Sequence, residues 1–249
     1  MSKVSISTIT YAKSFITKTW DNHPQMLEYE RRGFFQFLYV TACGHAESVI
    51  CDYLKSFLYF SLFDIRKLEA FSQRTMEVDG VKHLINTEPE QRAVQRILES
   101  TIKDIDKSSF NRIEILHKLI VGSTICETIG PDLYGNLMGL ISVRNLLAHG
   151  RELYIEIAVD EANEFSVDTS FEKHPLEKAI KSLQKAKLYN SEQYDSNDTD
   201  GPKSAIYQVE AMKHFWKTSV EVGKIYRRRA DSEKLISMWW TAELEELYP

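Results

Sequence analysis

The longest run of helically spaced apolar residues lies between Gln25 and about Asp64. Apolar side chains recur there at helical intervals, no proline interrupts them, and they cover most of the helix circumference. They include Phe34, Phe37, Leu38, Val40, Val49, Ile50, Tyr53, Leu54, Phe57 and Leu58. A helix with so little polar surface is predicted to lie at the centre of the fold.

The middle of this helix combines small and polar residues. The small ones indicate that another helix packs closely at this level; they are Ala42, Cys43, Gly44 and Ala46. His45 and Glu47 stand among them, either as a buried hydrogen-bonded pair or as polar groups that face a cleft.

Shorter elements follow this helix. Residues 65–87 predict a shorter helix and a turn at Asp79-Gly80, and a new helix begins at Glu88, with Pro89 in its first turn. Ser108 or Ser109 is expected to cap the next helix.

The helix after that one ends in the most informative part of the chain. Gly130-Pro131-Asp132 is expected to open it, and it is expected to run to His149. Gly150 then fits the residue that terminates it.

The remaining segments complete a mainly α fold. Alternating residues over 152–169 predict a β-hairpin appended after the helix that ends at His149, and Pro175–Leu188 returns to helical spacing. Residues 190–201 predict a mobile acidic loop, and 203–249 predict C-terminal helices that include Trp239-Trp240. Residues 1–24 are interpreted as an N-terminal arm. We expect one domain over 1–249, an up-and-down helical bundle with the appended hairpin.

The composition and net charge exclude an all-β fold and argue against a general nucleic-acid-binding protein. Glycine (10) and proline (6) are too scarce for an all-β fold, and 43% hydrophobic residues suffice for a core. The net charge of −5 argues against indiscriminate binding to nucleic acid, so any such site must be a local basic cleft.

The cysteines and the N-terminal residues indicate in which cellular compartment the protein works and whether it binds a metal. The three cysteines form no CxxC pair and no metal-ligand spacing, which favours a reducing cytoplasm and predicts no metal or cofactor. The first 25 residues lack a signal-peptide pattern, and charges interrupt the apolar stretch Phe34–Phe63, so no membrane association is expected.

The stretch from Arg144 to Gly150 reads Arg-Asn-Leu-Leu-Ala-His-Gly. Its short form, Arg-x4-His, occurs twice in the chain and is therefore weak evidence by itself. The other copy, Arg112 to His117, lacks the polar residue after arginine and the final glycine, and is expected in the middle of a helix. We interpret that copy as structural and the longer form as the candidate site.

Helix geometry sets Arg144 apart. One apolar arc of its helix contains Leu137, Leu140, Ile141, Val143, Leu147 and Ala148. Arg144 falls inside this arc, where a guanidinium requires a partner, an anion or a cleft. Asn145 and His149 share a neighbouring face, and the helix dipole at that end favours a protonated imidazole. The alternatives are helix C-terminal capping or an ion pair of Arg144, for instance with Glu47.

The seven-residue stretch resembles the Arg-x4-His motif of the HEPN superfamily, which often has a polar residue after the arginine and ends in Ala-His-Gly. The resemblance implies a HEPN-like helical bundle and metal-independent cleavage of RNA through its own 2′-hydroxyl. It implies that His149 transfers a proton and Arg144 holds the phosphate, while Asn145 either orients His149 or contacts the scissile phosphate. It also implies a homodimer, since two motifs line one cleft, and the role of a toxin or anti-phage effector with an antitoxin or defence-system partner.

One residue departs from the family pattern, and the role of a C-terminal arginine cluster has two explanations. HEPN toxins silenced by nucleotidyl transfer carry a tyrosine two residues after the histidine, where this chain has Arg151. Helix-end pairing explains Arg227-Arg228-Arg229 more simply than RNA binding does. The alternative function is a catalytically inactive HEPN module that binds a nucleotide, RNA or protein partner.

Overall fold

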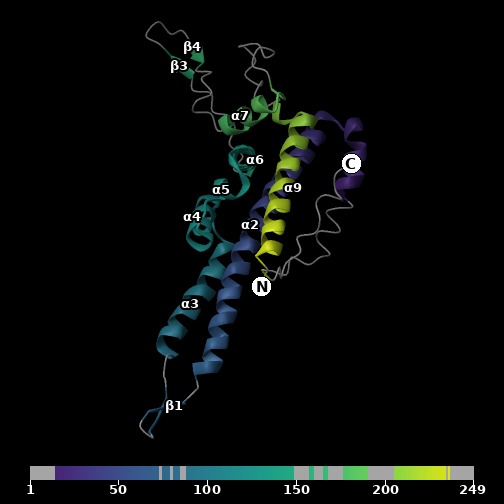
Figure 1. Ribbon diagram of the computed structural model, residues 1–249. Coiled ribbons are helices and arrows are strands. Elements are labelled where there is room, and N and C mark those ends of the chain that lie inside the picture. Colours follow the sequence, from purple (N-terminus) through teal and green to yellow (C-terminus); the bar gives the residue numbers. More distant parts are fainter. Residues whose placement is uncertain are drawn as a thin grey trace. The chain divides into compact units, whose positions relative to one another are not determined.

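The computed structural model describes residues 15–72, 75–78, 81–84, 88–148, 157–159, 165–167, 176–189, 205–233 and 235 (Figure 1). His149, Gly150 and Arg151 lie outside these ranges, and so do the loop predicted at 190–201 and the pair Trp239-Trp240. Within the described ranges the chain is mainly helical, as the sequence predicts.

The chain divides into two compact units. Unit 1 comprises Met1–Ala46, Ile129–Gly223 and Thr241–Pro249, and unit 2 comprises Glu47–Thr128 and Lys224–Trp240. Each has its own fully buried apolar side chains. Those of unit 1 include Phe35, Leu137, Leu140 and Phe215, and those of unit 2 include Ile50, Leu54, Ile105 and Ile125.

The long central helix, α2, spans Glu28–Ser72 and contributes to both units. It therefore continues beyond the predicted end at Asp64, because residues 65–72 contain neither glycine nor proline. The predicted close packing at Ala42–Ala46 is confirmed, since Ser219 Oγ donates a hydrogen bond of 2.7 Å to the Ala42 carbonyl.

The prediction of a separate helix within 65–87 is wrong. Strands β1 (Thr75–Val78) and β2 (Val81–Leu84) follow α2 and pair antiparallel, with Val78 opposite Val81. Two residues, Asp79-Gly80, separate the strands, and this dipeptide between alternating residues is a strong hairpin signal.

The described part of residues 1–24, the segment interpreted as an N-terminal arm, is itself helical. Residues 15–22 are helical, and a short 3-10 helix, η1, follows at His23–Gln25. The reason is aromatic packing. Phe15 meets Phe34 edge to face at a ring-centroid distance of 6.5 Å, and Trp20 stacks on Phe35 at 6.4 Å.

The three helices predicted between residues 88 and 148 are confirmed. They are α3 (Glu88–Ile105), α4 (Phe110–Val121) and α6 (Pro131–Ala148). The short α5 (Ile125–Ile129), between α4 and α6, was not predicted. Ser109 is the N-cap residue of α4, although its side chain makes no capping hydrogen bond. Gly122 and Gly130 have φ of 81° and 86°, a left-handed conformation that glycine adopts without strain, and they separate these helices.

The C-terminal part of the described chain begins with two short strands, β3 (Ile157–Val159) and β4 (Phe165–Val167), which pair antiparallel. These six residues are the described part of the span 152–169. Helix α7 (Glu177–Lys185) follows, and α9 (Val209–Ser232) is the last described helix.

Candidate functional site

The end of α6 belongs to unit 1 and carries the described part of the candidate motif. Leu137, Leu140 and Val143 are fully buried, which confirms most of the predicted apolar arc. Arg144 lies half-buried inside the arc, and Asn145, the next residue, is exposed. Leu146, which the predicted arc leaves out, is also buried, with 7% of its surface exposed.

Arg144 is held against the central helix. Its Nε donates to Cys43 Sγ at 3.4 Å, and Cys43 is fully buried in α2. A guanidinium on an apolar arc needs such a polar or polarisable partner, and the sulfur of Cys43 provides one at its base. The contact fixes the side chain of Arg144 relative to α2.

Hydrogen bonds also join this part of α2, at Ala42 and His45, to α9. Because the Ser219 hydroxyl donates its one proton to the Ala42 carbonyl, it accepts from His45 Nδ1, which lies 2.9 Å away. His45 therefore carries a proton on Nδ1. Ser219 is fully buried, so this pair of bonds joins the two helices in the interior of unit 1.

A second polar cluster holds α6 farther from its end. Ser182 Oγ of α7 donates to Asn136 Oδ1 of α6 at 2.7 Å, and lies 2.9 Å from His214 Nε2 of α9. Since the hydroxyl proton goes to Asn136, Nε2 of His214 is the donor in the second bond. Burial lowers the pKa of His214, and the nearby Lys217 lowers it further.

Close helix packing reinforces this cluster. A Cβ on Gly139 of α6 would lie 3.0 Å from Phe215 Cε1 and 3.2 Å from both Ala179 Cα and the Lys178 carbonyl oxygen. Only glycine fits this approach without a shift of the α7 backbone. Helix α6 is therefore positioned by α2, α7 and α9 together.

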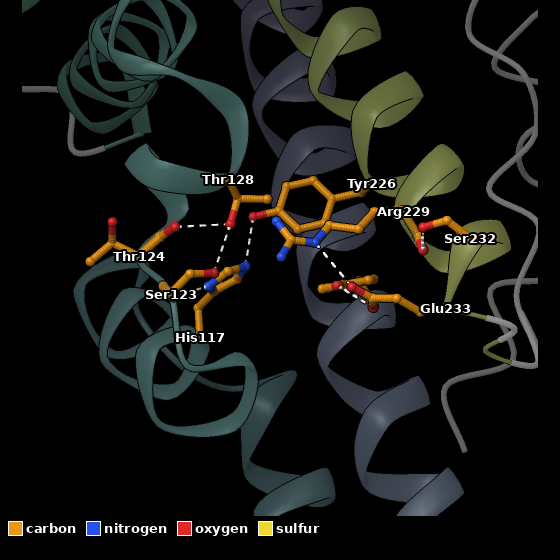
Figure 2. A network of polar contacts seen from close by, with 9 residues as sticks. His117, Ser123, Thr124, Thr128, Tyr226, Arg229, Ser232 and Glu233 are labelled. Atoms are coloured by element: carbon orange, nitrogen blue, oxygen red, sulfur yellow. Dashed lines mark hydrogen bonds and ion pairs between the residues drawn. The ribbon is translucent and has the colours of Figure 1, made fainter.

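The other Arg-x4-His copy lies in α4, in unit 2. Figure 2 shows the surroundings of its histidine, His117. His117 is fully buried, and its Nδ1 donates to the Ser123 carbonyl at 2.7 Å. Its Nε2 lies 2.9 Å from the Tyr226 hydroxyl. Burial lowers the pKa of His117, so the ring is neutral and accepts the Tyr226 proton. Both ring nitrogens are used within the fold, while Arg112 is exposed.

Neighbouring groups complete this network in unit 2. The Tyr53 hydroxyl donates to Glu233 at 2.6 Å, and Arg229 Nε donates to the same carboxylate at 3.1 Å. Burial raises the pKa of Tyr53, and its bond to Glu233 raises it further. Arg229, which the sequence left open between helix-end pairing and RNA binding, thus forms an ion pair with Glu233, the residue that follows α9.

Sequence reasoning missed Ser219, Ser182, Asn136 and His214. A usable signal existed for Ser219, because it stands between Phe215 and Val222 on the buried stripe of α9. The described side chains include no group of three or more His, Cys, Asp or Glu placed to hold a metal ion. No helix in the described ranges is long and apolar enough to cross a bilayer.

No protein-family model, curated protein or solved structure matches the chain.

Proposed function

We propose that the chain is a metal-independent endoribonuclease of HEPN type, with its site at Arg144, Asn145 and His149. The observation that carries the proposal is the setting of Arg144. Its half-buried side chain is oriented by Cys43 near the end of α6, one residue before the exposed Asn145. A fixed arginine beside an exposed amide at a helix end suits the binding of a phosphate.

The chemistry would be transesterification within the RNA. The 2′-hydroxyl attacks the adjacent phosphorus, its proton passes to a base, and the 5′-oxygen leaves with a proton from an acid. One His149 supplies one of these proton transfers, and Arg144 stabilises the charge on the phosphorane. The products are a 2′,3′-cyclic phosphate and a 5′-hydroxyl.

The second proton transfer requires a second histidine. A homodimer would bring two copies of Arg144, Asn145 and His149 to one cleft and make that cleft basic despite the net charge of −5. Within a cell we propose a cytoplasmic toxin or anti-phage effector, controlled by an antitoxin or a defence-system partner and needing no cofactor.

An inactive HEPN-type binding module is the second candidate. The contact of Arg144 with the buried Cys43 favours it, because an arginine that only stabilises the packing of α6 on α2 would make the same contact. Such a module would bind a nucleotide, RNA or protein through the exposed Asn145 without cleaving anything.

The two candidates are separated by a toxicity and cleavage experiment. Wild type, His149→Ala and Arg144→Ala are expressed from a tight promoter, with Arg112→Ala as the matched control from the other copy. We expect growth arrest from wild type and Arg112→Ala only. Purified wild type should cut RNA in EDTA and leave 2′,3′-cyclic phosphate ends, whereas equal harmlessness of all four chains and no cleavage would contradict the ribonuclease.

A further inference from the structure

The exposed side of α7 carries a row of lysines. Lys178, Lys181 and Lys185 are all exposed, and their intervals of three and four residues place them on one face of the helix. We call these three residues the α7 row. Residues 176–189 contain four lysines and a single carboxylate, whereas the whole chain has a net charge of −5. The α7 row therefore belongs to a local basic surface on an acidic protein.

The lysines of the row are available to another anion. Lys178 forms no ion pair with a described residue. Lys181 pairs with Glu177 one turn before it, and Lys185 pairs with Asp132 of α6. The side chains of the second pair are 64% and 78% exposed, and such exposed ion pairs contribute little to stability. The row can therefore exchange these carboxylates for the oxygens of a bound ligand.

Helix α7 is fixed to α6, the helix that carries Arg144, and runs antiparallel to it. Three contacts pair rising residue numbers on α7 with falling numbers on α6: Ala179 with Gly139, Ser182 with Asn136, and Lys185 with Asp132. The start of α7 is thus the end nearer to Arg144. Gly139 precedes Arg144 by five residues, which is about 7.5 Å along the helix axis. The α7 row begins near the candidate site and extends away from it.

The chemistry of the row favours a phosphate backbone. Lysine binds phosphate as a point charge, and the three lysines succeed one another roughly every 5 Å along the axis, so they can contact successive phosphates of one strand. The exposed residues between them include no aromatic side chain on which a base could stack, so the row recognises charge and not base sequence.

A membrane surface fits α7 less well. A helix that lies on a bilayer inserts its apolar side among the lipids. The apolar side of α7 is already buried in the core of unit 1, where it contributes Ala179, Ile180 and Leu183.

We propose that the α7 row binds the phosphate backbone of single-stranded RNA outside the Arg144 site. Lys217 of α9 adds to this surface. It is exposed and lies one turn after His214, whose Nε2 is 2.9 Å from Ser182 of α7. The choice of RNA rests on the proposed function, but the lysine surface is argued from unit 1 alone. Its test measures binding and not cleavage, so a failure of either proposal can be distinguished.

The test is fluorescence anisotropy with a single-stranded oligouridylate whose 2′-O-methyl groups prevent cleavage, from about 50 to 200 mM salt. One variant of the full chain changes the α7 row to glutamine: Lys178→Gln, Lys181→Gln and Lys185→Gln. The matched control changes three exposed lysines of unit 2: Lys103→Gln, Lys107→Gln and Lys118→Gln. Both variants lose three positive charges, so they differ only in where the charge is removed.

The α7 variant should bind the strand at least about 10-fold more weakly at the lowest salt concentration. Its slope of log Kd against log salt should fall by about 2, since each lost phosphate contact of a single strand removes about 0.7. The control should stay within about two-fold of wild type. A wild type that does not bind, or an equal weakening in both variants, would overturn the proposal.

Two further outcomes are decisive. Vesicles that contain phosphatidylserine should not bind. If they bind through the α7 row while binding of the strand is unchanged in the α7 variant, the surface is a membrane contact and the proposal fails. A wild type that binds the strand through the α7 row but cuts no RNA supports this inference and rejects the ribonuclease. A chain that cuts RNA and binds the strand without the α7 row does the reverse.

Discussion

The sequence contains the Arg-x4-His spacing twice, and the arginines of the two copies, in α4 and α6, have different environments. In α4 the histidine is buried and the arginine is exposed. His117 uses both ring nitrogens on Ser123 and Tyr226. In α6 the arginine is half-buried against Cys43, and the polar residue after it is exposed.

This difference follows from where each copy stands in its helix. Arg112 occupies the first turn of α4, so its partner His117 falls in the middle of the helix on the core face. Arg144 stands four residues before Ala148, the last residue of α6. Spacing alone therefore does not define a site, and the position relative to the helix end and the core separates a structural copy from a candidate site.

The largest expected effect tests the structural role of the α4 copy. His117→Ala should destabilise the protein by about 3 kcal/mol, since it opens a cavity and leaves the buried Tyr226 hydroxyl without its acceptor. Arg112→Ala, at the exposed end of the same copy, should change stability by less than about 0.5 kcal/mol. Urea denaturation measures both. If the two substitutions changed the free energy of unfolding equally, the buried His117 would have no greater structural role than the exposed Arg112, which would contradict the prediction.

A smaller effect tests how α6 is positioned. Gly139→Ala should destabilise the protein by about 2 kcal/mol, because its Cβ would meet the α7 backbone. Gly135→Ala in the same helix meets open space and should stabilise by up to about 1 kcal/mol. Thermal melts of the two variants should therefore shift in opposite directions, and a shift in the same direction would show that α6 is not packed closely on α7.

The smallest effect is a pH dependence that belongs to unit 2. Burial raises the pKa of Asp52 to about 6, although the nearby Lys55 lowers it. The unfolded carboxyl has the lower pKa, so this group contributes stability at acid pH that is lost as pH rises through about 6. Between pH 5 and 7.5 the loss should be on the order of 1 kcal/mol.

His117 opposes this contribution. Its lowered pKa means that the unfolded chain takes up the proton first, so its contribution is lost as pH falls below about 6.5. Asp52→Asn removes the carboxyl and should leave a protein whose stability only falls on acidification in this range. Urea midpoints at pH 5 and 7.5 measure this, and an unchanged pH profile in Asp52→Asn would contradict the shift.

The sequence predicted the helices well where apolar period and terminal residues agree. Pro131 and Asp132 mark the start of α6, and its arc of leucines indicated the buried face on which Arg144 stands. The hairpin at β1 and β2 was missed because Asp79-Gly80 was interpreted as a turn after a helix, although the residues on both sides alternate.

The partners of the candidate site were not predictable in the same way. His45 meets Ser219, and Arg144 meets Cys43, across long separations in sequence. Helical period shows which face is buried, but it does not show which helix covers it. The bond of Ser182 to Asn136 likewise depends on the pairing of α6 with α7.

The most direct test of the central claim compares the two arginines as ribonuclease residues. The rate of RNA cleavage in EDTA is measured for purified wild type, Arg144→Ala and Arg112→Ala at equal concentrations of folded protein. We predict that Arg144→Ala loses at least about 100-fold, since it removes stabilisation of the phosphorane, while Arg112→Ala stays within about two-fold. A wild type that does not cleave RNA, or a loss of equal size in both variants, would contradict the account.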